Sequence, residues 1–83
     1  MREVSFSKSS LLALRRMPAN VSTTIRAKIT QYADDPTSLA NNVTRLKGRT
    51  GWRLRVGDWR VIFDDDGAVL AILAIGPRGG IYE

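Results

Sequence analysis

The spacing of apolar residues predicts an extended start followed by two helices. Val4-Ser5-Phe6 alternates apolar and polar side chains and predicts a short strand. A first helix carries Leu11, Leu12 and Leu14, and hydroxyl side chains just before it can cap its N-terminus. The candidate caps are Ser7, Ser9 and Ser10. Because proline suits the first turn of a helix, Pro18 begins a second helix and does not lie inside one long helix.

The second helix carries one apolar stripe with helical spacing. Its members are Val21, Ile25, Ile29 and Tyr32. Asp34-Asp35-Pro36 ends the helix, because the residue before a proline is pushed out of the α-helical region. The two helices are therefore expected to form a short hairpin that lies on a sheet, with Tyr32 in the core or at its rim.

From Asn42 onward the apolar pattern changes to a period of two, which predicts strands. The strands are expected at 43–47, 52–56, 59–64 and 68–75, with turn residues between them. The last of these is almost continuously apolar, so we expect it to be central and covered on both faces. The predicted fold is α+β: an N-terminal strand, a two-helix hairpin, and an antiparallel meander of about three to four strands. The whole of 1–83 is expected to be one domain.

The Gly57-Asp58 turn sets the register of the strand pair at 52–56 and 59–64. It places Arg55 opposite Arg60, and alternation then separates two faces. The core face carries Trp52, Leu54, Val56, Trp59, Val61 and Phe63, and the other face carries Arg53, Arg55 and Arg60. Like charges directly opposite each other are destabilising. The simplest reason to keep the Arg55–Arg60 pair is an anion that sits between the two side chains.

Charge supports an anionic partner. The net charge is +5, and six of the 13 basic residues fall within 45–60, where Asp58 is the only acid. Arginine offers a planar fork that suits phosphate and stacks on bases. This pattern alone fits a solvated outer face, a general nucleic-acid-binding face or a phosphoryl-transfer site.

The residue types that are absent limit the chemistry. The chain has no cysteine and no histidine, which excludes a disulfide framework, a thiolate nucleophile and histidine general base catalysis. Asp64-Asp65-Asp66 precedes a glycine and is expected to form a turn, not a magnesium site. We expect no metal and no cofactor. The start has no signal-peptide pattern and the longest apolar run is too short to span a bilayer, so a cytoplasmic protein without a membrane partner is expected.

Two stretches carry a resemblance to a known family. Leu46-Lys47-Gly48 and the strand pair from Trp52 to Phe63 resemble the central motif of RelE toxins, and Ile75-Gly76-Pro77-Arg78 with Tyr82 resembles their closing motif. The resemblance implies a helical hairpin on a mainly antiparallel sheet of about four strands. It also implies a type II toxin whose partners are a cognate antitoxin and the ribosome with mRNA in its decoding site. Operator DNA, bound through the toxin–antitoxin complex, is a further expected partner.

The implied activity is metal-independent mRNA cleavage by attack of the 2′-hydroxyl on the adjacent phosphate. By position in the motif, Arg53 and Arg55 match phosphate-contacting residues and Arg60 matches the arginine that stabilises the transition state. Arg78 matches a proton donor near the leaving 5′-oxygen, and Tyr82 matches a tyrosine that stacks on or orients the base. The expected catalytic residues are thus Arg55, Arg60, Arg78 and Tyr82, and the expected RNA- or phosphate-binding residues are Arg45, Lys47, Arg49 and Arg53.

Two other functions remain open. Pro77 stands where the family often has Lys or His, and the gap from Arg78 to Tyr82 is shorter than in some members. The ParE branch shares the fold but inhibits DNA gyrase without nuclease activity. A degenerate toxin would only bind its antitoxin and act as a co-repressor. The basic residues at the nuclease positions favour the RelE-like endoribonuclease.

Overall fold

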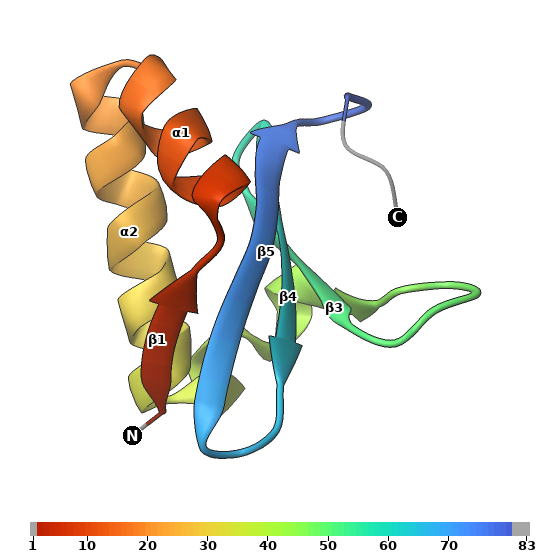
Figure 1. The fold of residues 1–83 in the computed structure, drawn as a ribbon. Coiled ribbons are helices and arrows are strands. Elements are labelled where there is room, and N and C mark those ends of the chain that lie inside the picture. The colour runs from red at the N-terminus through yellow and green to blue at the C-terminus, as the bar shows by residue number, and fades with distance from the viewer. Residues whose placement is uncertain (1, 81–83) are drawn as a thin grey trace.

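The structure, a computed structural model, describes residues 2–80 and confirms the α+β class (Figure 1). The elements, in chain order, are β1 (Glu3–Phe6), α1 (Lys8–Arg16), α2 (Ala19–Asp34), the 3-10 segment η1 (Pro36–Asn42), β2 (Val43–Arg45), β3 (Trp52–Val56), β4 (Trp59–Asp65) and β5 (Val69–Pro77). Several element bounds differ from the sequence prediction. The segment η1 was not predicted, and the strand expected at 43–47 ends at Arg45. The strand expected at 59–64 continues to Asp65, and the one expected at 68–75 begins at Val69 and continues to Pro77.

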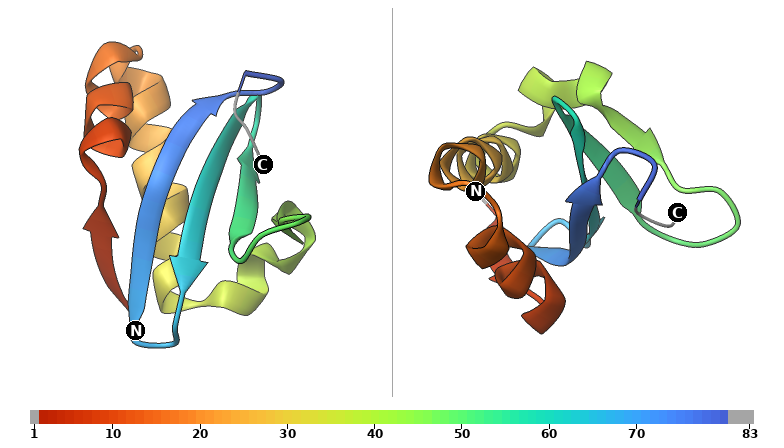
Figure 2. Two further views of the ribbon diagram at one scale, coloured as in Figure 1. Left: turned by 45° about the vertical axis from the view of Figure 1, so that its right-hand side comes forward. Right: turned by 90° about the horizontal axis from the view of Figure 1, so that it is seen from above.

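The five strands form one sheet in the order β1-β5-β4-β3-β2, with the helices over one face (Figure 2). The meander from β2 to β5 is antiparallel, as predicted. The N-terminal strand was predicted but its partner was not: β1 pairs in parallel with β5, with Val4 opposite Leu70. The chain therefore places its first and last described strands side by side.

The core lies between the helices and the sheet. Ile25, Ile29 and Tyr32 of the predicted helical stripe are buried, and the Tyr32 and Phe63 ring centroids lie 5.0 Å apart. Burial and the neighbouring Asp65 carboxylate raise the pKa of Tyr32. Trp52 and Trp59 are partly buried against the core, which confirms their placement on the core face.

The N-terminus of α1 is held by serine hydroxyls. Ser7 is the N-cap, and its Oγ accepts a hydrogen bond from the Ser10 amide at 3.1 Å. The register of β4 against β5 shifts between Ile62 and Phe63, so Leu73 of β5 has no partner residue in β4. The Ser7 hydroxyl donates to the Leu73 carbonyl at 2.8 Å. The fully buried Ser10 donates to the Ile72 carbonyl at 3.2 Å. The predicted cap thus also joins the helix to an irregular point of the sheet.

The expectation that the last strand is covered on both faces is wrong. β5 is internal, between β1 and β4, but only its core face, with Leu70, Ile72 and Ile75, is buried. Its other face carries small, half-buried side chains because helices cover the sheet on one side only. Register places Ala71, Ala74 and Gly76 on that outer face.

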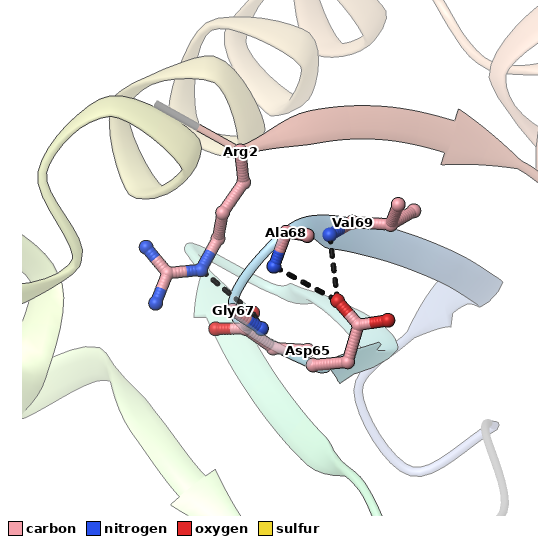
Figure 3. Close-up of polar contacts among 6 residues, drawn as sticks. Arg2, Asp65, Gly67, Ala68 and Val69 are labelled. Atoms are coloured by element: carbon pink, nitrogen blue, oxygen red, sulfur yellow. Dashed lines mark hydrogen bonds and ion pairs between the residues drawn. The ribbon is translucent and has the colours of Figure 1, made fainter.

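The acidic turn is structural, as expected (Figure 3). The Asp66 carboxylate accepts hydrogen bonds from the amides of Ala68 and Val69, at 2.9 and 2.7 Å. These two hydrogen bonds lower the pKa of Asp66. Asp65 accepts from the Arg2 Nε at 2.6 Å and from the Gly67 amide at 2.9 Å. Both carboxylates are therefore occupied in holding the β4–β5 turn and the start of the chain.

Within residues 2–80, no helix is long and apolar enough to cross a membrane.

Candidate active site

The outer face of the sheet carries two parallel rows of side chains. The predicted register is confirmed: Arg55 lies opposite Arg60, and Val56 lies opposite Trp59. Gly76 lies opposite Arg60 on the next strand, so the row ends at a position without a side chain. In the second row, Thr44 lies opposite Arg53 and Arg53 opposite Ile62. Three arginine side chains thus share one face of β3 and β4.

These rows line a pocket of about 230 Å³, which we call the arginine pocket. Its lining residues are Asn41, Asn42, Thr44, Arg53, Arg55 and Arg60. None of them is acidic, so the pocket presents three cations and neutral polar groups. The like-charged Arg55–Arg60 pair costs a few tenths of a kcal/mol to about 1 kcal/mol in the absence of an anion. The pocket is therefore suited to a phosphate or another oxyanion.

Arg60 is fixed by the turn that precedes it. Its Nη1 donates to the carbonyl of Gly57 at 3.0 Å and to the carbonyl of Trp59 at 2.9 Å. The sequence predicted a side chain on the solvated face, and the structure shows that Arg60 is half-buried there and bound to backbone. Its Nε and Nη2 groups carry the remaining N–H donors. A charged donor held before substrate arrives needs little reorganisation when it meets an anion.

The C-terminal part of β5 brings Arg78 to the same turn. The Arg78 amide donates to the Asp58 carbonyl at 2.7 Å, which joins the end of the sheet to the β3–β4 turn. The exposed Arg78 side chain does not line the arginine pocket. Tyr82 lies outside the described residues.

The other predicted phosphate-binding residues are not gathered at this pocket. Arg45 lies on the other face of the sheet edge, with its guanidinium over the Trp52 ring at 5.3 Å from the centroid. Lys47 and Arg49 are exposed on the β2–β3 loop, where the Leu46 amide donates to the Gly51 carbonyl. Of the eight site residues expected from the sequence, the structure brings together Arg53, Arg55 and Arg60.

Sequence reasoning missed the neutral wall of the pocket. Asn41 and Asn42 end η1, and Thr44 lies in the middle of β2. A signal was present, because Asn42 and Thr44 alternate with Val43 in the same period of two that placed the arginines. Without the partner register of β2, their face could not be assigned.

No group of three or more potential metal-ligating side chains occurs in the described part of the chain. Neither Arg55 nor Arg60 forms an ion pair with another described residue.

Comparison with solved structures places this fold among toxins of toxin–antitoxin systems. The RelE–RelB complex from Pyrococcus horikoshii OT3 aligns with a TM-score of 0.77 at 26% identity, over 96% of this chain and 98% of that chain. The isolated E. coli RelE toxin aligns with a TM-score of 0.76 at 15% identity, over 98% of this chain and 88% of that one. The RelB–RelE complex from Methanococcus jannaschii gives 0.73 at 20% identity, over 94% of each chain. The fold and its basic face therefore define a small toxin of the RelE type of structure.

A family model described as the ParE toxin of the type II toxin–antitoxin system parDE matches residues 4–82. The chain belongs to this toxin family. A search among curated proteins gave no match.

Proposed function

We propose that this toxin is an endoribonuclease that cleaves mRNA on the ribosome and thereby inhibits translation. The observation that carries the proposal is the Arg55–Arg60 pair, in which two like charges lie directly opposite each other in a pocket that no acid lines. A scissile phosphate between the two guanidinium groups would remove the repulsion and gain charge-assisted hydrogen bonds. RNA supplies both that phosphate and the attacking group.

The proposed reaction is an internal transfer. The 2′-oxygen attacks the adjacent phosphorus, the bond from phosphorus to the 5′-oxygen breaks, and the products carry a 2′,3′-cyclic phosphate and a 5′-hydroxyl. The 2′-hydroxyl would give its proton to solvent water, and the leaving 5′-oxygen would take a proton from Arg78, which regains one from water. Negative charge grows on the five-coordinate phosphorus, and Arg60, which is bound to the carbonyls of Gly57 and Trp59, would stabilise that charge.

Arg55 and Arg53 serve as cations that position the RNA. The Arg55 guanidinium has no lone pair that can accept a proton, so Arg55 does not act as the general base. Arg78 would supply the proton to the leaving oxygen. Its amide binds the Asp58 carbonyl of the β3–β4 turn, and Asp58 lies two residues before Arg60. Tyr82 would orient a base. Outside the pocket, Arg45, Lys47 and Arg49 would contact flanking phosphates.

The proposed partners follow from the same surface. Several similar solved structures are complexes of RelE with its antitoxin RelB. We infer that a cognate antitoxin with an acidic or amphipathic segment covers this basic face and blocks RNA. The ribosome would present the mRNA, so the toxin would act in the cytoplasm, and the toxin–antitoxin complex would bind operator DNA.

Primer extension on a reporter mRNA translated in vitro tests the proposal. The assay compares wild-type protein with Arg60→Ala and with the control Arg16→Ala, which removes an exposed arginine on α1. We expect ribosome-dependent cuts that fall about 100- to 1,000-fold in Arg60→Ala, the usual effect of removing one preorganised transition-state donor. Arg16→Ala should cut like wild type. Equal cutting by both variants would mean that the site is elsewhere.

The match to the ParE family model favours one second candidate, inhibition of DNA gyrase. A folded wild-type protein that leaves mRNA intact but inhibits gyrase supercoiling would establish that function in place of the nuclease.

A further inference from the structure

We propose that Asn42, with Asn41 beside it, reads the base next to the scissile phosphate and that the site prefers adenine. This inference rests on the proposed nuclease function and assigns a specificity-determining role to residues outside the arginine set. Its basis is the composition and geometry of the arginine pocket, in which the two carboxamides form one wall.

The end of η1 places Asn42 in the same pocket as the arginines of β3 and β4. Asn42 directly precedes Val43, which lies opposite Leu54, and it lines the pocket together with Arg55 and Arg60. Arg55 lies opposite Arg60, on strands about 5 Å apart. A phosphate held between the arginines would leave its attached nucleoside within reach of the amide.

The wall that carries Asn42 is held by the scaffold. Pro36 begins η1, and the Val43 amide donates to the Ala40 carbonyl where the segment ends. The Gln31 side chain of α2 donates to the Ser38 hydroxyl at 3.0 Å, which links η1 to the long helix. Asn42 is half-buried, whereas Asn41 is exposed at the rim. Asn42 is thus the better-positioned of the two amides, and binding sites on fixed elements discriminate more sharply.

The hydrogen-bonding groups of the side chains that line the pocket assign base recognition to the asparagine amides. Arginine side chains only donate hydrogen bonds, so the three guanidinium groups suit phosphate oxygens and other acceptors. Adenine presents an amino donor beside a ring-nitrogen acceptor. A carboxamide matches that pair with its oxygen and its NH₂ group, which is the usual bidentate contact of asparagine with adenine. In this pocket Asn41 and Asn42 are the lining side chains that offer both groups together.

The test is a comparison of cut-site distributions. Wild type, Asn42→Ala and the control Asn20→Ala are each incubated with translating ribosomes on one long reporter mRNA, and all cuts are mapped by primer extension. Asn20 is exposed on α2 and lies outside the arginine pocket. Thermal melts of all three proteins establish that each is folded.

We expect wild type and Asn20→Ala to cut preferentially beside adenine. In Asn42→Ala this preference should fall about fivefold or more, the loss expected from one bidentate base contact, while cuts beside other bases continue. Cuts with an unchanged distribution in Asn42→Ala would overturn the inference and leave the nuclease function standing. Loss of cutting at every base by the folded variant would also overturn it, because Asn42 would then be needed for cleavage as such. No cutting by the wild type would overturn the proposed function and this inference together.

Discussion

Gly51 closes the β2–β3 loop in a conformation that a side chain would disturb, which makes Gly51→Ala a sharp test of the structure. Its φ is +115°, a region that residues with a Cβ essentially avoid, and such strain costs about 1–3 kcal/mol. A Cβ added there would lie 2.9 Å from Asp64 Oδ1, 3.2 Å from Leu46 Cδ1 and 3.2 Å from the Phe63 carbonyl oxygen. Asp64 can rotate away, but the Phe63 carbonyl belongs to the backbone of β4.

Crowding of this kind typically costs another 1–3 kcal/mol, so Gly51→Ala should lose about 2–6 kcal/mol in all. Small domains are stable by only about 5–15 kcal/mol. The matched control is Gly48→Ala in the same loop. Its φ is +74°, and a Cβ there meets nothing within 4 Å, so the cost should be about 1–2 kcal/mol.

Urea denaturation of the purified proteins, followed by tryptophan fluorescence, gives the two free energies of unfolding. Gly51→Ala should unfold at a clearly lower urea concentration than Gly48→Ala. A third protein, Gly51→Ala with Asp64→Ala, should recover only part of the loss, because the backbone strain and the Phe63 contact remain. Equal midpoints for the two single variants would refute the loop geometry, and full recovery in the double variant would mean that only the Asp64 contact matters.

Two further predictions concern the acidic turn. Asp65→Asn removes the ion pair between Asp65, whose side chain is 10% exposed, and Arg2, whose side chain is 25% exposed. It should destabilise the fold by about 1–2 kcal/mol, between the values for exposed and buried ion pairs. The difference from wild type should shrink in 1 M NaCl, and a loss independent of salt would contradict an ionic contribution. Amide hydrogen bonds from Val69 and Ala68 hold the pKa of Asp66 below its ordinary value of 3.8. The ionised Asp66 carboxylate therefore stabilises the folded protein above about pH 4. This stabilisation disappears as the pH falls through the lower pKa of Asp66 in the folded state. Melting temperatures of wild type and Asp66→Asn from pH 7 to pH 2 should therefore converge at the acid end, and a gap that widens there would show the opposite sign.

Local patterns predicted those parts of the fold in which neighbours in sequence are neighbours in space. The stripe of Ile25, Ile29 and Tyr32 identified the buried face of α2, and the Gly57-Asp58 turn set the β3–β4 register residue by residue. The parallel pairing of β1 with β5 joins strands more than 60 residues apart. A four-residue strand carries no local signal for such a partner.

In the candidate site, too, local sequence patterns predicted some features and not others. Alternation placed Arg53, Arg55 and Arg60 on one face, as the structure has them. It could not show that the Arg60 guanidinium binds carbonyls of its own turn, because that contact depends on a side-chain rotamer. Nor could it separate Arg45, which stacks on Trp52, from the arginines of the pocket. That separation depends on the register of β2 against β3, which sets Arg45 opposite Trp52.

The position of β5 within the sheet also governs when the toxin can become active during its own synthesis. β5 lies between β1 and β4, yet the ribosome makes it after every element that it joins. Until it emerges, β1 has no partner in the sheet and the serines of α1 have no β5 carbonyls to bind. The Arg78 amide likewise cannot reach the β3–β4 turn. Because β5 is the last of the described strands to be made, the sheet of the nascent chain stays incomplete for most of its synthesis. A toxin that attacks translation, as proposed above, would thereby be completed only after its own message had been read through the codons for β5.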